Sequence, residues 1–118
     1  MTGIESDESM ASAPDFSCTV HRDAGRVVVT VEGDVDIATA PVLYATLREA
    51  ADGPGGSVVA DFAEVGFIDS SGVQCLLAVQ HEMASHGATL TVQRARENVL
   101  LVFELLGLTD LLLVGGAS

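Results

Sequence analysis

Short stretches in which apolar and polar residues alternate are followed along this chain by stretches in which apolar residues recur at helical spacing. Alternation over 16–21 and again over 27–31, with turn residues at 23–25 between them, predicts two strands joined as a hairpin. Residues 58–62 are a short apolar run typical of a strand covered on both faces, and alternation returns over 88–92. Because helical patterns separate the later strands, we expect an α/β domain with right-handed crossovers.

Three stretches have the apolar spacing of amphipathic helices. The first is predicted to begin after a cap at Thr39, to carry Pro41 in its first turn and to end before the glycine-rich residues 53–56. The second follows Ile68, and residues 111–114 are a candidate last strand after the third. The residues expected on the buried stripes are Leu43, Leu47, Ala50 and Ala51, then Val73, Leu76, Leu77, Met83 and Ala84, then Val99, Val102, Phe103 and Leu106. The predicted fold is a mixed, mostly parallel sheet of four or five strands with three or more helices.

The acidity of the chain limits what it can bind. Its 118 residues are enough for one ordinary domain, and 48% apolar against 19% charged residues is typical of a globular protein. Seventeen acidic residues and only five basic ones, all arginine, give a formal net charge of -12, which repels phosphate backbones and anionic lipids. We therefore expect no direct nucleic-acid binding and no membrane binding. The charge either favours a partner with a basic surface or serves solubility alone.

The first residues differ from the rest in composition. Residues 1–15 are polar, acidic and aperiodic, which predicts a flexible acidic tail before one ordered domain over 16–118. The N-terminal residues lack the basic and apolar regions of a secretion signal, and no later apolar run reaches the length of a membrane span. A cytoplasmic protein is expected.

The residue types that carry metal or catalytic chemistry are not clustered in this sequence. Cys18 and Cys75 belong to no Cys-x-x-Cys motif, which indicates two small buried side chains instead of a metal site or a disulfide. A nucleophile elbow at Ser70 would need Gly two residues earlier, where Ile68 stands. The glycines of 53–56 precede a predicted strand and not a helix, unlike those of a phosphate-binding loop. No metal, no cofactor and no enzymatic activity are therefore expected.

Two polar turns follow predicted strands and precede predicted helices. They are Gly33-Asp34-Val35-Asp36 and Asp69-Ser70-Ser71-Gly72. In sheets of this kind, ligands and partners gather at the carboxyl ends of the strands. The two turns are therefore predicted to share one surface.

These residues resemble the STAS domain family, and within it the small stand-alone anti-sigma factor antagonists. The resemblance rests on the two turns and on 58–62 as the central strand, and it extends over about 16–114. In the family, the Ser directly after the Asp is phosphorylated by an anti-sigma factor that is also a serine kinase, and that position here is Ser70. The resemblance implies partner switching. The unphosphorylated form binds the anti-sigma factor and releases the sigma factor, phosphorylation of Ser70 abolishes binding, and a metal-dependent serine phosphatase restores the active form.

Six residues of the two turns are expected to contact the partner: Gly33, Asp34, Asp36, Asp69, Ser71 and Gly72. Each has a structural alternative. Asp69 either orients the neighbouring hydroxyl or caps the second helix, for which Ser71 is the better candidate. Asp34 and Asp36 either meet the partner or initiate the first helix, and Gly72 either admits a partner backbone or avoids crowding in the turn.

A Ser at the start of a helix suits a phosphorylation switch, because its hydroxyl lies near backbone N–H groups without intrahelical partners. A phosphate there is tolerated or stabilised by the helix end, so it acts on the partner and not on the fold. The remaining interpretation is a non-switching STAS scaffold or adaptor subunit of a stress-signalling or lipid-transport assembly, in which Ser70 is never phosphorylated.

Overall fold

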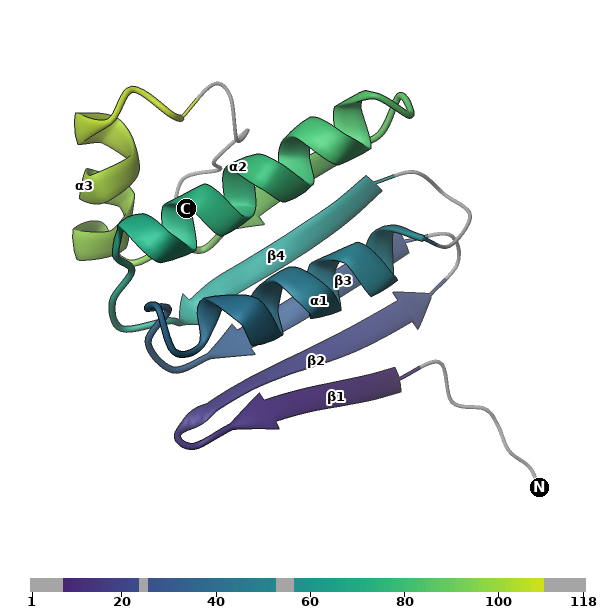
Figure 1. Ribbon diagram of the computed structural model, residues 1–118, viewed down its shortest axis with the longest axis horizontal. Helices are drawn as coiled ribbons and strands as arrows, with labels where there is room; N and C mark the ends of the chain where they lie inside the picture. The colour runs from purple at the N-terminus through teal and green to yellow at the C-terminus, as the bar shows by residue number, and fades with distance from the viewer. Residues whose placement is uncertain (1–7, 24–25, 53–56, 110–118) are drawn as a thin grey trace.

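Five strands and three helices make up the described part of the chain, in a computed structural model that describes residues 8–23, 26–52 and 57–109 (Figure 1). The strands are β1 (Glu8–Ala13), β2 (Phe16–Asp23), β3 (Arg26–Glu32), β4 (Ser57–Glu64) and β5 (Thr89–Gln93). The helices are α1 (Ala40–Ala51), α2 (Ser70–Ala84) and α3 (Glu97–Leu105). The expected α/β class is confirmed.

The strands form one mixed sheet in the order of the sequence, β1-β2-β3-β4-β5. β1, β2 and β3 pair antiparallel, whereas β3, β4 and β5 pair parallel. The predicted hairpin and the parallel crossovers are both present. The sheet is less parallel than expected because β1 adds an antiparallel pairing.

The helices cover one face of the sheet. In Figure 1, α1 and α2 run side by side across that face, and α3 lies at one end of the molecule beside the start of α2. Alternate strand residues are buried beneath the helices: Phe16, Cys18 and Val20, Val27, Val29 and Val31, Val58, Ala60 and Phe62, and Leu90 and Val92. The residues between them are half-buried or exposed. Val59 is one of these half-buried residues, so the prediction that 58–62 is covered on both faces is wrong for the part of the chain that the structure describes.

The predicted stripes supply most of the helical core. Leu43 and Leu47 of α1 and Leu76 of α2 have no exposed surface, and each contributes about 1.5–3 kcal/mol through burial. Ala84 and Leu106 were expected on the stripes but are exposed. Both stand where a helix ends, at the last residue of α2 and at the residue after α3, where the helical stripe no longer faces the sheet.

An edge strand occupies part of the expected N-terminal tail. Residues 8–13 pair with β2 in a regular antiparallel register, with Met10 opposite Thr19 and Ala11 opposite Cys18. The prediction of a flexible tail is therefore wrong for 8–13, while 1–7 lie outside the described residues. The strand was not predicted because Met10 is exposed, so backbone hydrogen bonds hold β1 more than burial does.

The candidate last strand at 111–114 also lies outside the described residues. Within those that are described, no helix combines the length and the apolar character needed to cross a membrane.

Candidate functional site

The two polar turns lie side by side at one edge of the sheet. Val35 and Ile68 form an isolated parallel bridge. The Val35 N–H donates to the Phe67 carbonyl at 2.8 Å, and the Asp69 N–H donates to the Val35 carbonyl at 3.0 Å. The turns are 34 residues apart when counted from Val35 to Asp69. Their predicted meeting at one surface is confirmed.

Asp69 begins α2 as its N-cap. Its backbone is extended, and Oδ1 accepts hydrogen bonds from the N–H of Ser71 at 2.8 Å and of Gly72 at 3.1 Å. The capping interpretation of Asp69 is confirmed. Ser71 is not the N-cap, because it lies inside the first turn, where its own N–H is the group being capped.

Ser70 is the first residue of α2, and its side chain is exposed. Among the described residues, none hydrogen-bonds to its hydroxyl, whereas the next serine along, Ser71, is half-buried. An exposed hydroxyl without an internal partner is available to an incoming protein. Ser70 thus carries the exposed hydroxyl of this turn, while Asp69 is used as the helix cap.

Gly72 brings the second turn against the first. It is buried, and a Cβ at this position would lie 2.6 Å from side-chain atoms of both Ile68 and Val35. Real Cβ atoms do not approach carbon this closely, so only glycine fits without a shift of the helix. Gly72 therefore shapes the site from beneath and presents little surface to a partner.

The first turn is built on Asp36, whose Oδ1 accepts from the N–H of Ala38 at 2.9 Å and of Thr39 at 3.1 Å. Thr39 occupies the N-cap position of α1 but makes no side-chain cap bond to the helix. Its hydroxyl donates instead to the Asp34 carbonyl at 2.8 Å and accepts from the Asp36 N–H at 2.9 Å. Thr39 is therefore the N-cap by position, as expected, but the side-chain bond of a cap is absent because the hydroxyl points back into the turn.

Asp34 and Gly33 complete this turn in different ways. The Asp34 side chain is exposed, so its carboxylate faces solvent. Gly33 has a φ of 112°, and a Cβ there would collide with the Asp15 carbonyl. Asp34 is available to a partner, whereas Gly33 and Asp36 fix the course of the chain.

Two residues that the sequence did not single out for the site hold the loop before Asp69 in place. The Arg96 Nε donates to the Ala63 carbonyl at 3.0 Å, and the Asn98 Nδ2 donates to the Gly66 carbonyl at 2.8 Å. Arg96 also lies 3.7 Å from Glu64 in an ion pair. No local motif signals these bonds, because the partners are 32 or 33 residues apart.

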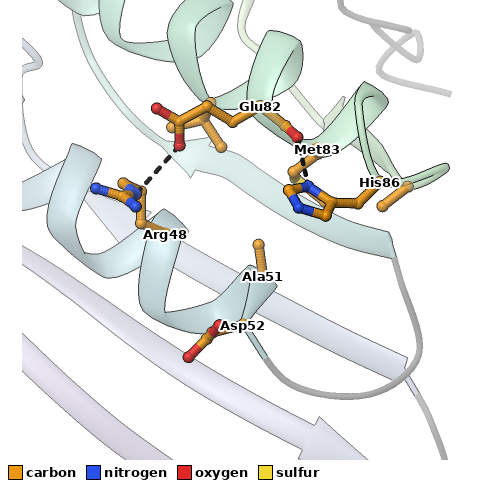
Figure 2. A pocket seen from close by; sticks show the side chains of 8 residues that line it. Arg48, Ala51, Asp52, Glu82, Met83 and His86 are labelled. Atoms are coloured by element: carbon orange, nitrogen blue, oxygen red, sulfur yellow. Dashed lines mark hydrogen bonds and ion pairs between the residues drawn. The ribbon is translucent and has the colours of Figure 1, made fainter.

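The other end of α2 carries a pocket of about 350 Å³ between the last turns of α1 and α2 (Figure 2). The Arg48 Nε pairs with a Glu82 carboxylate oxygen at 3.1 Å, and the Tyr44 hydroxyl donates to the other oxygen at 2.8 Å. The His86 ring lies 2.9 Å from the Glu82 carbonyl. Glu82 is twelve residues beyond Ser70, so the pocket is about 18 Å along the helix from the exposed hydroxyl.

Both cysteines face the core. Burial raises the pKa of Cys18 and of Cys75 from 9.0 to about 12, which keeps both thiols protonated and unreactive at neutral pH. The prediction of two small buried side chains is confirmed. In the described ranges, no three His, Cys, Asp or Glu side chains gather as a metal site.

Comparisons with known proteins agree with this geometry. The family model described as "Mlab, STAS domain" matches residues 18–115. The anti-sigma-B factor antagonist of Bacillus subtilis is 23% identical over 104 residues, which are 88% of this chain and 94% of that protein.

Two solved structures show the same fold. An anti-sigma factor antagonist from Mycobacterium paratuberculosis has a TM-score of 0.75 at 30% identity, over 88% of this chain and 89% of that one. The anti-sigma factor antagonist SpoIIAA in its unphosphorylated form has a TM-score of 0.72 at 21% identity, over 86% of this chain and 88% of that one. With its five-stranded mixed sheet and its two joined turns, the chain belongs to the STAS domain family.

Proposed function

We propose that this protein is an anti-sigma factor antagonist whose binding is switched by phosphorylation of Ser70. The observation that carries the proposal is the exposed Ser70 hydroxyl at the start of α2, beside the Gly33–Asp36 turn. Membership of the STAS family and the names of the relatives support it. The unphosphorylated protein binds an anti-sigma factor that is also a serine kinase, and the sigma factor is released.

The proposed switch acts through charge on the partner. Asp69 already occupies the N–H groups of Ser71 and Gly72, so a phosphate on Ser70 finds these donors taken and a carboxylate beside it. It therefore extends outward, toward the docking protein. A charge of about -1.5 to -2 facing a partner carboxylate about 6 Å away is worth roughly 3 kcal/mol or more at an effective dielectric near 20. This weakens binding by on the order of a hundredfold.

The chain supplies only the acceptor hydroxyl. In the phosphorylation step, the Ser70 oxygen bonds to the γ-phosphorus of kinase-bound ATP, ADP leaves and the hydroxyl proton passes to a base of the kinase. A serine phosphatase reverses the modification by hydrolysis. The kinase, its nucleotide and the phosphatase are other chains, so this proposal assigns the protein no catalysis of its own and places it in the cytoplasm with its partners.

Binding of Ser70 variants to the purified anti-sigma factor kinases of the source genome tests the proposal. We expect wild type and Ser70→Ala to bind one of them equally in the absence of ATP, and Ser70→Asp to bind about a hundredfold more weakly. With ATP, mass spectrometry should find a phosphate on Ser70 of the wild type and none on the Ser70→Ala chain. Ser85→Ala is the matched control, because it removes an exposed hydroxyl at the other end of α2 and should keep both binding and phosphorylation.

Equal binding by wild type, Ser70→Ala and Ser70→Asp would contradict the switch. That result would favour the alternative, a non-switching scaffold or adaptor subunit.

A further inference from the structure

Large apolar side chains that remain exposed gather at the Ser70 end of the molecule. Within the described residues, six large apolar side chains are exposed. Two stand beside the two turns, two belong to α3, one directly follows α3, and one is on the edge strand β1: Ile37 and Phe67, Leu101 and Leu105, Leu106, and Met10. Scattered single exposed apolar residues are ordinary, but such a grouping marks an interaction site.

Two of these side chains flank the Ser70 turn. Ile37 is 77% exposed and stands two residues beyond Val35, and Phe67 is 49% exposed and stands one residue before Ile68. Val35 and Ile68 are the residues that bridge the two turns. Ile37 and Ser70 therefore follow the bridge by two residues each, on neighbouring segments. Exposed apolar side chains therefore stand on both of the segments that meet at Ser70.

The start of α3 continues this surface. The Asn98 side chain bonds to the carbonyl of Gly66, the residue before Phe67. Asn98, Leu101 and Leu105 are spaced by three and four residues and share one side of α3. Leu101 is 51% exposed and Leu105 is 75% exposed. Figure 1 shows α3 next to the beginning of α2, at the end where the two turns lie.

The charged side chains at this end of the molecule indicate which kind of protein binds there. The exposed carboxylates around the apolar side chains are those of Asp34, Glu64, Glu97 and Glu104. Of the two arginines here, Arg96 is paired with Glu64 and Arg94 is paired with Asp61. With a net charge of -12, two copies of the chain that met through this end would repel each other. The surface fits a different protein with an apolar patch ringed by Arg and Lys.

We propose that Ile37, Phe67, Leu101 and Leu105 form an apolar docking surface for the anti-sigma factor, which meets it with an apolar patch that has basic residues at its rim, opposite the exposed carboxylates, and the partner carboxylate of the proposed switch opposite Ser70. This inference rests on the proposed function and extends the contact from the two turns onto α3. It also gives the Ser70 phosphate a second effect. The modified group would have to lose its water inside an apolar contact, which is unfavourable for a charged group.

Equilibrium binding of full-length variants to the purified anti-sigma factor kinase tests the surface. We expect Phe67→Ser to weaken binding about tenfold or more, and the double variant Leu101→Gln/Leu105→Gln to weaken it about fivefold or more. Met10→Gln is the matched control, because Met10 is 68% exposed on β1, and it should bind within twofold of wild type. Raising the salt concentration should slow association while Phe67→Ser should speed dissociation.

Three results would overturn the surface. The first is wild-type binding by both apolar variants, which leaves the switch intact if Ser70→Asp still loses binding. The second is a fall of more than a few degrees in the melting temperature of the leucine variant, which would mean that the chain itself covers these side chains. The third is a concentration-dependent dimer in sedimentation that Phe67→Ser abolishes, which would assign the surface to a second copy. Loss of binding in the apolar variants with normal binding by Ser70→Asp would support the surface and contradict the switch.

Discussion

The two ends of α2 differ in how their polar groups are satisfied. At the far end, Arg48, Glu82 and Tyr44 bind one another around a pocket, so these three side chains have partners within the chain. At the near end, the Ser70 hydroxyl has no partner among the described residues. The pocket is the more conspicuous hollow, yet the exposed hydroxyl that has no partner among the described residues is at the other end. For a protein that works by binding another protein, an exposed polar group without an internal hydrogen bond is a better guide to the binding site than a pocket.

The largest expected difference in partner binding is between two variants that each add one negative charge, at opposite ends of α2. Ser70→Asp should weaken binding of the anti-sigma factor by on the order of a hundredfold, whereas Ser85→Asp should leave it within twofold. Ser85 is exposed and is the C-cap of α2, so the added charge is the same and only its place differs. Surface plasmon resonance with the purified kinase measures both. Equal loss in the two variants would show that overall charge, and not the Ser70 end, controls binding.

Gly72→Ala should destabilise the near end through packing alone. Its Cβ would meet Val35 and Ile68 at 2.6 Å, and we expect unfolding to be easier by about 1–3 kcal/mol in urea titration. Ala78→Gly is a useful comparison, since Ala78 lies exposed in the middle of the same helix and the change costs about 1 kcal/mol from helix propensity alone. A Gly72→Ala protein as stable as wild type would contradict the tight contact between the turns.

Loss of the α2 cap should have a smaller effect on stability. Asp69→Ala leaves the N–H groups of Ser71 and Gly72 without their acceptor and should lower the free energy of unfolding by about 1 kcal/mol. Asp52→Ala is the control at the end of α1, where the exposed carboxylate accepts no hydrogen bond from a described residue. Urea denaturation monitored by circular dichroism compares them. An equal change in both variants would remove the special role of Asp69.

The smallest effect is expected at the far end. Arg48→Gln breaks the ion pair with Glu82, but both side chains are about half exposed, at 58% and 44%. Exposed pairs contribute about 0–1 kcal/mol, so the free energy of unfolding should change by less than about 1 kcal/mol and partner binding should not change. A tenfold loss of binding in this variant would make the pocket part of the interface and would end the contrast between the two ends.

The sequence was a good guide to features that depend on local patterns. Alternation and helical spacing gave the hairpin, the crossovers and three helices, and the rule for strand ends brought Gly33–Asp36 and Asp69–Gly72 together. The sequence was a poor guide to features that depend on contacts between residues far apart in the chain. Edge strand β1 buries too few apolar side chains to show the alternation of a strand. The hydrogen bonds from Arg96 and Asn98 to the loop before Asp69 join residues that no sequence motif connects.

Caps and exposure were harder to predict for a different reason. Asp69, Ser70 and Ser71 are all residue types that cap helices, and a shift of one position decides which of them does so. Thr39 stands at a cap position but turns its hydroxyl toward Asp34 and Asp36. In the same way, the sequence pattern did not single out Ile37 and Phe67, and only the packing of the turns shows that these apolar side chains are exposed.

The contact of Gly72 with Val35 and Ile68 has a consequence for recognition. Because the first turn rests directly on the base of the second helix, neither can swing outward without the other. A binding partner therefore meets a surface that already has its bound shape. Little conformational entropy is lost on binding, because this surface does not have to be ordered. Phosphorylation of the Ser70 oxygen can then change the fit of the whole surface to a partner, without any rearrangement of the chain that carries it.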